Sequence, residues 1–227
     1  KSDMKRVQLE CGGKSPNIVF ADHDNLDFVA EKSAYAIFGN QGEVCSAGSR
    51  LIIQKEIKNK FIKKLIQISK NMMPGDPLDP QSFMGAIVDK SQLEKIDNYV
   101  ISGKNEGAKV AVGGKVDRIN TGGYYYEPTI LDDVSNDMKV AREEIFGPVL
   151  SAISFKDPQE ALRISNDTEY GLAAAVWTNN INTAHLIAKG LRAGSVYINN
   201  YEEDVDTTIP AGGYKQSGIG RDNSYHA

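Results

Sequence analysis

The chain has 227 residues, of which 41% are hydrophobic and 25% are charged, the balance of an ordinary globular protein. Its formal net charge is −4 and its lysines and arginines are scattered, so nothing predicts a nucleic-acid surface. No apolar run reaches the roughly 18 residues of a membrane span, and neither a signal peptide nor a disulfide framework is indicated, so we expect a cytoplasmic protein without a membrane partner.

Strand-like and helix-like segments alternate along most of the chain, which predicts an α/β domain around a largely parallel sheet. Strands are predicted over residues 6–10, 17–20, 51–54, 109–112, 126–131, 149–155, 172–178 and 195–199. Helices are predicted over residues 26–40, 56–71, 90–105, 158–166 and 181–191, the fourth of them starting at Asp157 as N-cap. No repeat or linker divides the chain, so we expect one domain.

Cys45 is one of only two cysteines, and its surroundings are unusual for a buried thiol. It follows an apolar helical pattern and lies within residues 41–48 (QGEVCSAG), which are mostly small or polar. A lone cysteine is most often a packing residue in an apolar core. The composition around Cys45 instead favours an accessible nucleophile.

Glu10 ends the first predicted strand, just before the paired glycines Gly12 and Gly13. Paired glycines let the backbone turn sharply or approach a ligand closely, which would leave the carboxylate facing open space at a sheet edge. A surface glutamate before a turn explains the same stretch equally well. Together with Cys45, Glu10 supplies a candidate base for a candidate nucleophile, the minimum set for covalent acyl chemistry. For Cys11, between Glu10 and Gly12, a packing or backbone role is predicted.

Two further runs are unusual. Residues 142–149 (REEIFGPV) lead two carboxylates into an aromatic residue and a Gly-Pro turn. They indicate either a charged helix end or a carboxylate that holds a ligand hydroxyl, with Phe146 as an apolar wall. Residues 210–221 are rich in glycine, and such a segment is often a flexible loop. They match no dinucleotide-binding fingerprint.

In this order, the four runs resemble the active-site segments of the NAD(P)-dependent aldehyde dehydrogenase superfamily. Residues 9–15 resemble its glutamate signature and residues 38–49 its cysteine signature, and the resemblance covers essentially the whole chain. Residues 196–201 and 213–218 look most similar to gamma-glutamyl-gamma-aminobutyraldehyde dehydrogenases of putrescine breakdown. The resemblance implies the three-layer αβα catalytic domain of that fold, formed by residues 1–227.

The same resemblance implies a role for each candidate residue. Cys45 would attack an aldehyde to form a thiohemiacetal, which passes hydride to NAD or NADP and leaves a thioester. Glu10 would activate the water that hydrolyses the thioester, and it could also activate the Cys45 thiol beforehand. The Cys45 backbone N–H would contribute to an oxyanion hole. Glu144 would bind the nicotinamide ribose, Phe146 would flank the cofactor, and the Cys11 backbone would lie near the nicotinamide amide. No metal is implied.

In the family, a dinucleotide-binding half precedes this region and an oligomerisation arm follows it. The chain has no initiator methionine and ends within a motif-like stretch, so we expect a piece of a longer protein that forms a homodimer or homotetramer. Alone, this piece is expected to bind NAD(P) weakly and to show negligible dehydrogenase activity. Tyr225 takes the place of a second glutamate found in many members, so no proton relay is implied there.

Substrate preference and function leave alternatives. The four carboxylates of residues 202–206, beside the expected substrate tunnel, either favour an aminoaldehyde or form a solvated acidic loop. The chain could also be a nicotinamide-independent thiol esterase or acyl-transferase that uses Cys45. A third reading is a catalytically silent module that contacts other subunits, and the thiol reactivity of Cys45 separates it from the first two.

Overall fold

The computed structural model describes residues 3–201 and 207–225. Its centre is a seven-stranded sheet in the order β10-β9-β2-β3-β8-β7-β4, in which only β4 runs antiparallel to its neighbour. This confirms the predicted α/β class with a largely parallel sheet. The strands are β2 (Pro16–Val19), β3 (Arg50–Gln54), β4 (Lys109–Val112), β7 (Thr129–Asp132), β8 (Val149–Phe155), β9 (Ala173–Trp177) and β10 (Ser195–Ile198).

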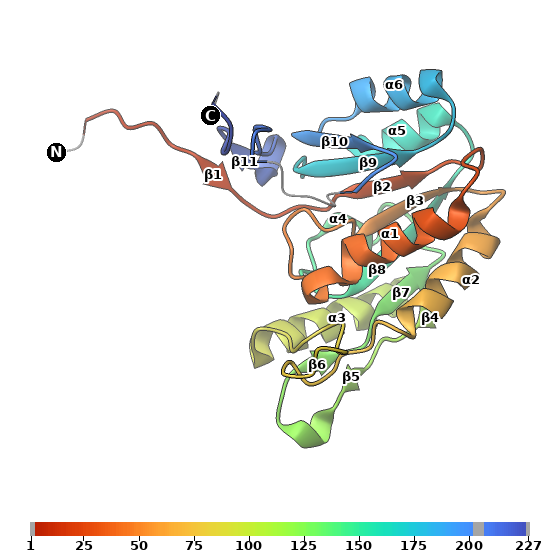
Figure 1. Cartoon of the computed structure of the whole chain (residues 1–227), viewed down its shortest axis with the longest axis vertical. Helices are drawn as coiled ribbons and strands as arrows, with labels where there is room; N and C mark the ends of the chain where they lie inside the picture. The colour runs from red at the N-terminus through yellow and green to blue at the C-terminus, as the bar shows by residue number, and fades with distance from the viewer. Residues whose placement is uncertain (1–2, 202–206, 226–227) are drawn as a thin grey trace.

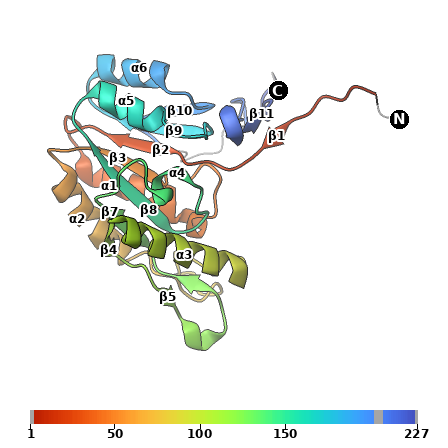
Figure 2. The same ribbon diagram turned by 180° about the vertical axis from the view of Figure 1, so that it is seen from behind.

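Helices cover both faces of this sheet and make three layers (Figure 1). One face carries α1 (Leu26–Phe38) and α2 (Lys58–Ser69), whose buried residues share a core with Val19 and Leu51. The other face, in front in Figure 2, carries α3 (Lys90–Glu106), α4 (Lys139–Arg142), α5 (Pro158–Asn166) and α6 (Ile181–Gly190).

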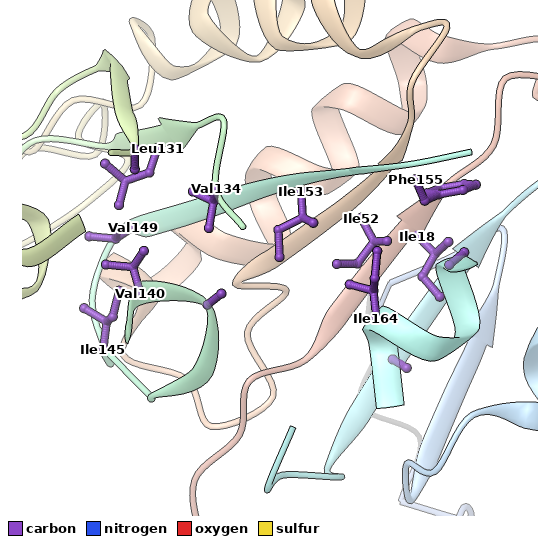
Figure 3. Packing of buried hydrophobic residues seen from close by; sticks show 14 of the residues in the cluster. Ile18, Ile52, Leu131, Val134, Val140, Ile145, Val149, Ile153, Phe155 and Ile164 are labelled. Carbon is purple, nitrogen blue, oxygen red and sulfur yellow. The ribbon is translucent and has the colours of Figure 1, made fainter. Parts of the chain in front are cut away.

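The central strands are buried on both faces, as parallel strands between two helical layers must be. Along β8, Val149 and Ile153 belong to the core under α3–α6, whereas Leu150 and Ala152 belong to the core under α1 and α2. Figure 3 shows the first of these cores, with Ile153 between the groups around Val140 and Ile164. Strand alternation therefore decides which helical layer each side chain meets.

Four of the helices begin at a residue whose side chain accepts a backbone N–H of the first turn. These residues are Asn25, Asp89, Asp157 and Asn180, before α1, α3, α5 and α6 respectively. The Asp157 cap, which accepts from the Glu160 N–H at 2.8 Å, confirms the predicted start of α5.

Two predicted strands were wrong in extent. Of residues 6–10, only β1 (Leu9–Glu10) pairs, with β11 (Gly218–Ile219), while residues 3–8 are exposed and extend away from the body (Figure 1). Residues 126–131 divide into β6 (Tyr125–Tyr126), which pairs with β5 (Val116–Asp117), and β7, because Pro128 between them has no N–H for a ladder.

Short 3₁₀ turns complete the described chain: η1 (Gly39–Gly42), η2 (Ile119–Thr121) and η3 (Lys215–Ser217). Among the helices in the described ranges, none has the length and apolar character needed to cross a bilayer.

Candidate active site

The candidate residues meet at the edge of the sheet that is formed by the amino ends of its parallel strands. They meet there because the segments that carry them lead into three neighbouring strands. The Glu10 segment leads into β2, the Cys45 segment into β3 and the Glu144 segment into β8, and these strands lie side by side in the order β2-β3-β8. Open α/β sheets usually bind ligands beyond the carboxyl ends of their strands. Here the candidate groups gather at the amino ends.

The paired glycines make the contacts that join the three segments. A Cβ on Gly13 would lie 2.3 Å from the Cys45 carbonyl oxygen, and a Cβ on Gly12 would lie 2.1 Å from Glu144 Oε2. The Gly13 N–H also donates to Glu144 Oε1 at 3.0 Å. Only glycine allows both approaches, so the close backbone approach predicted for this pair is an approach to the cysteine and glutamate segments.

The loop that carries Cys45 is held on both sides of the cysteine. After α1, Asn40, Gln41 and Gly42 all adopt positive φ, which turns the chain sharply. The Glu43 carboxylate accepts the Val88 N–H at 3.1 Å, and burial raises its pKa. These contacts fix the backbone before Cys45.

Beyond the cysteine, the buried hydroxyl of Tyr201 donates to the Ser46 carbonyl at 2.6 Å. The Cys45 side chain itself is exposed, as is that of Cys11. Accessible sulfur on an anchored backbone is the arrangement that a nucleophile requires. In the sequence, Tyr201 is only the last residue of the family-like run 196–201; its contact with the cysteine loop is evident only in the structure.

Glu144 and Phe146 lie in the tight turn between α4 and β8, and both line one narrow pocket. Phe146 has a φ of 56°, and its carbonyl accepts the Gln92 side-chain amide at 2.6 Å. Its half-buried ring lines a narrow pocket together with Gly13 and Val44. The neighbouring Glu143 points elsewhere, accepting the Tyr99 hydroxyl at 2.7 Å. Of these two carboxylates, it is therefore Glu144 that contacts the paired glycines.

Glu10 is exposed and lies on the β1 edge. Its carboxylate is close to Gly212, where a Cβ would come within 3.1 Å of Oε1. The Cys11 N–H donates to the Ser217 carbonyl at 3.0 Å. The structure thus brings Cys11, Cys45, Glu144 and Phe146 to one edge, with Glu10 beside the glycine-rich run. Residues 202–206, the acidic segment singled out in the sequence, lie outside the described residues.

Lys14 is a buried cation beside this edge that the sequence did not single out. It is 1% exposed, and its Nζ has no hydrogen-bond partner among the described residues. Burial lowers its pKa to about 7, helped by the nearby charges of Arg50 and Lys95 and opposed by those of Glu144 and Glu143. Lysine is almost never fully buried unless it is paired, so this side chain costs stability when it is protonated.

Replacing Lys14 by methionine is expected to stabilise the fold at pH 6 by about 1–4 kcal/mol, because an apolar chain of similar size removes an unpaired buried charge. The unfolded lysine, with a pKa of 10.5, holds its proton through the interval in which the folded one has lost it. This group therefore makes stability rise between about pH 7 and pH 10.5, and its penalty is complete below pH 7. Urea unfolding at pH 6 and pH 10 checks this; a variant that is less stable at both would contradict it.

Comparison with known proteins gives a consistent result. The model of the aldehyde dehydrogenase family matches residues 1–227. The chain is 46% identical over 226 residues to the NADP/NAD-dependent aldehyde dehydrogenase PuuC of Escherichia coli (strain K12), covering 100% of this chain and 45% of that protein.

Solved structures agree. The aldehyde dehydrogenase KauB from Pseudomonas aeruginosa superposes with a TM-score of 0.96 at 59% identity, over 100% of this chain and 46% of that one. A gamma-glutamyl-gamma-aminobutyraldehyde dehydrogenase from Burkholderia cenocepacia J2315 gives a TM-score of 0.96 at 54% identity, over 99% and 45% respectively. The chain thus spans less than half the length of each of these proteins.

Proposed function

Because this chain belongs to the aldehyde dehydrogenase family, we propose that it forms the catalytic domain of a longer NAD(P)-dependent enzyme that oxidises an aldehyde to the carboxylic acid. The observation that carries the proposal is the contact of the Glu10–Gly13 segment with both the cysteine segment and Glu144 at one sheet edge. Residues 1–227 would be a single domain, with the rest of the dinucleotide site and the oligomer contacts supplied elsewhere in a cytoplasmic homo-oligomer.

Cys45 is the proposed nucleophile. Its sulfur attacks the aldehyde carbon, and the carbonyl oxygen that becomes negative is stabilised by the Cys45 backbone N–H. Bound NAD(P)⁺ supplies the hydride acceptor, and the thiohemiacetal on Cys45 thereby becomes a thioester. The anchoring of the loop by Glu43 and Tyr201 supports this role, because a fixed backbone keeps the oxyanion donor in place.

Glu10 is the proposed general base for the second half of the reaction. Its carboxylate takes a proton from the water that attacks the thioester, and the acid is released with the Cys45 thiol restored. Glu10 is exposed and lies three residues before the glycine that touches the Cys45 carbonyl. This position supports a base that reaches water at the thioester.

The residues expected to bind the cofactor fit its ribose and nicotinamide end. The Glu144 carboxylate accepts one N–H from Gly13 and has further lone pairs for ribose hydroxyls. The Phe146 ring and the Cys11 carbonyl offer an apolar wall and an acceptor for the nicotinamide amide. The sequence holds no G-x-G-x-x-G fingerprint, so the phosphates and adenine would be bound by another part of the enzyme.

The proposed substrate is an aminoaldehyde of the kind formed in putrescine breakdown. Similarity to the Burkholderia cenocepacia structure supports this class. The four carboxylates within residues 202–206 would favour a cationic substrate, although that segment lies outside the described residues.

Replacing Glu10 by glutamine in the complete enzyme is expected to slow steady-state turnover by roughly 10²–10³-fold, because the thioester then lacks its base. The first turnover should still produce one NADH per active site rapidly, since acylation does not depend on Glu10 in this scheme. Stopped-flow absorbance at 340 nm separates the two phases. Glu143→Gln, a matched change in a carboxylate that binds Tyr99, should leave both phases nearly unchanged. Equal slowing of both phases by Glu10→Gln would exclude the proposed role.

A further inference from the structure

The glycine-rich run of residues 210–221 is packed against the segment that carries Glu10. The turn η3 leads into β11, which pairs with β1 so that Gly218 lies opposite Glu10 and Ile219 opposite Leu9. The two short strands lie side by side in both views (Figures 1 and 2). Gly218 has a φ of 141°, and a Cβ there would lie 2.0 Å from the Leu9 carbonyl oxygen. The run is therefore an ordered partner of the glutamate segment.

Ser217 is the residue of this run that binds the glutamate segment through its side chain. It is 0% exposed. Its hydroxyl donates to the Gly12 carbonyl at 2.7 Å and accepts the Gly171 N–H at 2.9 Å. Its own carbonyl accepts the Cys11 N–H at 3.0 Å. One buried serine thus joins the two residues that follow Glu10 to the start of the segment leading into β9.

These bonds leave the position of the hydroxyl little freedom. A serine hydroxyl has one proton to donate, and Ser217 uses it on Gly12 while the Gly171 N–H occupies a lone pair. Removing the hydroxyl would leave the Gly12 carbonyl and the buried Gly171 N–H without this partner. The backbone after Glu10 would then keep its ladder contacts and the bonds of the Cys11 and Gly13 N–H groups, but the Gly12 carbonyl would lose its donor.

We propose that Ser217 is a positioning residue for Glu10, fixing the backbone of Cys11 and Gly12 so that the Glu10 carboxylate is held in place for hydrolysis of the thioester. This rests on the proposed function, because it assigns Ser217 to the second half-reaction. A contact on the other side of the run has a different role: Lys215 Nζ donates to the carbonyls of Asn166 and Thr168, away from Glu10.

The test uses the complete enzyme and p-nitrophenyl acetate without cofactor, so that acylation of Cys45 and its deacylation are seen as a burst and a steady rate. Ser217→Ala is expected to keep the burst amplitude and burst rate and to slow the steady rate by about tenfold, the effect of one lost hydrogen bond on a barrier. Lys215→Met, which removes two hydrogen bonds from the same run, is expected to leave both phases within about twofold.

The decisive comparison is the double variant with Glu10→Gln. If Ser217 acts through Glu10, Ser217→Ala adds no further slowing once the carboxylate is gone. The proposal would be overturned if the slowing of deacylation in the double variant were the product of the two single effects, or if the burst amplitude fell, because either result indicates a structural role. A raised KM for NAD(P) with unchanged ester deacylation would also overturn it, in favour of an effect through Glu144. If Ser217→Ala does not fold, Ser217→Cys, whose thiol is a weak donor, carries the same comparison. Unchanged deacylation in Glu10→Gln itself would refute the proposed role of Glu10 and the Ser217 proposal with it, whereas a Glu10 effect without a Ser217 effect refutes only the latter.

Discussion

Replacing Cys45 by alanine is expected to lower both aldehyde oxidation and ester hydrolysis by roughly 10⁴-fold or more, the size of effect seen when a covalent nucleophile is removed. Both activities need a bond between the sulfur and a carbonyl carbon, so neither can bypass the loss. Stability should change by no more than about 0.5 kcal/mol, because the side chain is exposed. Steady-state absorbance assays and thermal unfolding measure the two effects.

The second cysteine is the internal control. Cys11 is also exposed, but its expected cofactor contact is made by its backbone, so Cys11→Ala should reduce activity by less than about tenfold. Iodoacetamide labelling read by mass spectrometry should modify Cys45 faster than Cys11. If the Cys45→Ala enzyme still hydrolysed the ester, Cys45 would have no role in the chemistry. This result would favour the hypothesis that the chain is a catalytically silent module that contacts other subunits.

The secondary structure could be predicted from the sequence wherever a segment contains its own capping residues or its own hydrophobic pattern. The predicted bounds of α5, β4 and β8 coincide with those of the structure, and α5 starts at the expected Asp157 cap with Pro158 in its first turn. The first strand could not be delimited in this way, because β1 exists only where β11 pairs with it, near the other end of the chain. The local sequence of a two-residue strand does not show which distant segment pairs with it.

The chemistry of the site was predictable from residue types, whereas its assembly was not. Cysteine and glutamate beside glycines indicate a nucleophile and a base wherever they occur. That their segments meet follows from the strand order β2-β3-β8, and that order depends on the packing of both helical layers. The buried positions of Lys14 and Ser217 are equally a result of tertiary structure, since both residue types are usually exposed.

Arg50 is a buried residue that stabilises the edge of the sheet at which the candidate site lies. As the first residue of β3 it is 0% exposed, and burial lowers its pKa only to about 10, so it remains charged at neutral pH. Its guanidinium donates to the Lys14 carbonyl at 2.9 Å, the Ile164 carbonyl at 3.1 Å and the Ser165 carbonyl at 2.8 Å. It therefore ties the end of α5 to the backbone that follows the paired glycines.

Replacing Arg50 by methionine is expected to cost about 3–5 kcal/mol of unfolding free energy, since three buried carbonyls lose this charged donor together. Arg50→Lys should recover only part of the loss, because a single ammonium cannot reproduce the planar fork. Arg142→Met is the matched control: Arg142 meets Asp167 at 3.3 Å with 39% of its side chain exposed, so its removal should cost less than about 1 kcal/mol. Denaturant unfolding compares the three variants. Equal losses in Arg50→Met and Arg142→Met would mean that the buried fork contributes no more than a surface ion pair, and the edge would then depend on the strand ladder alone.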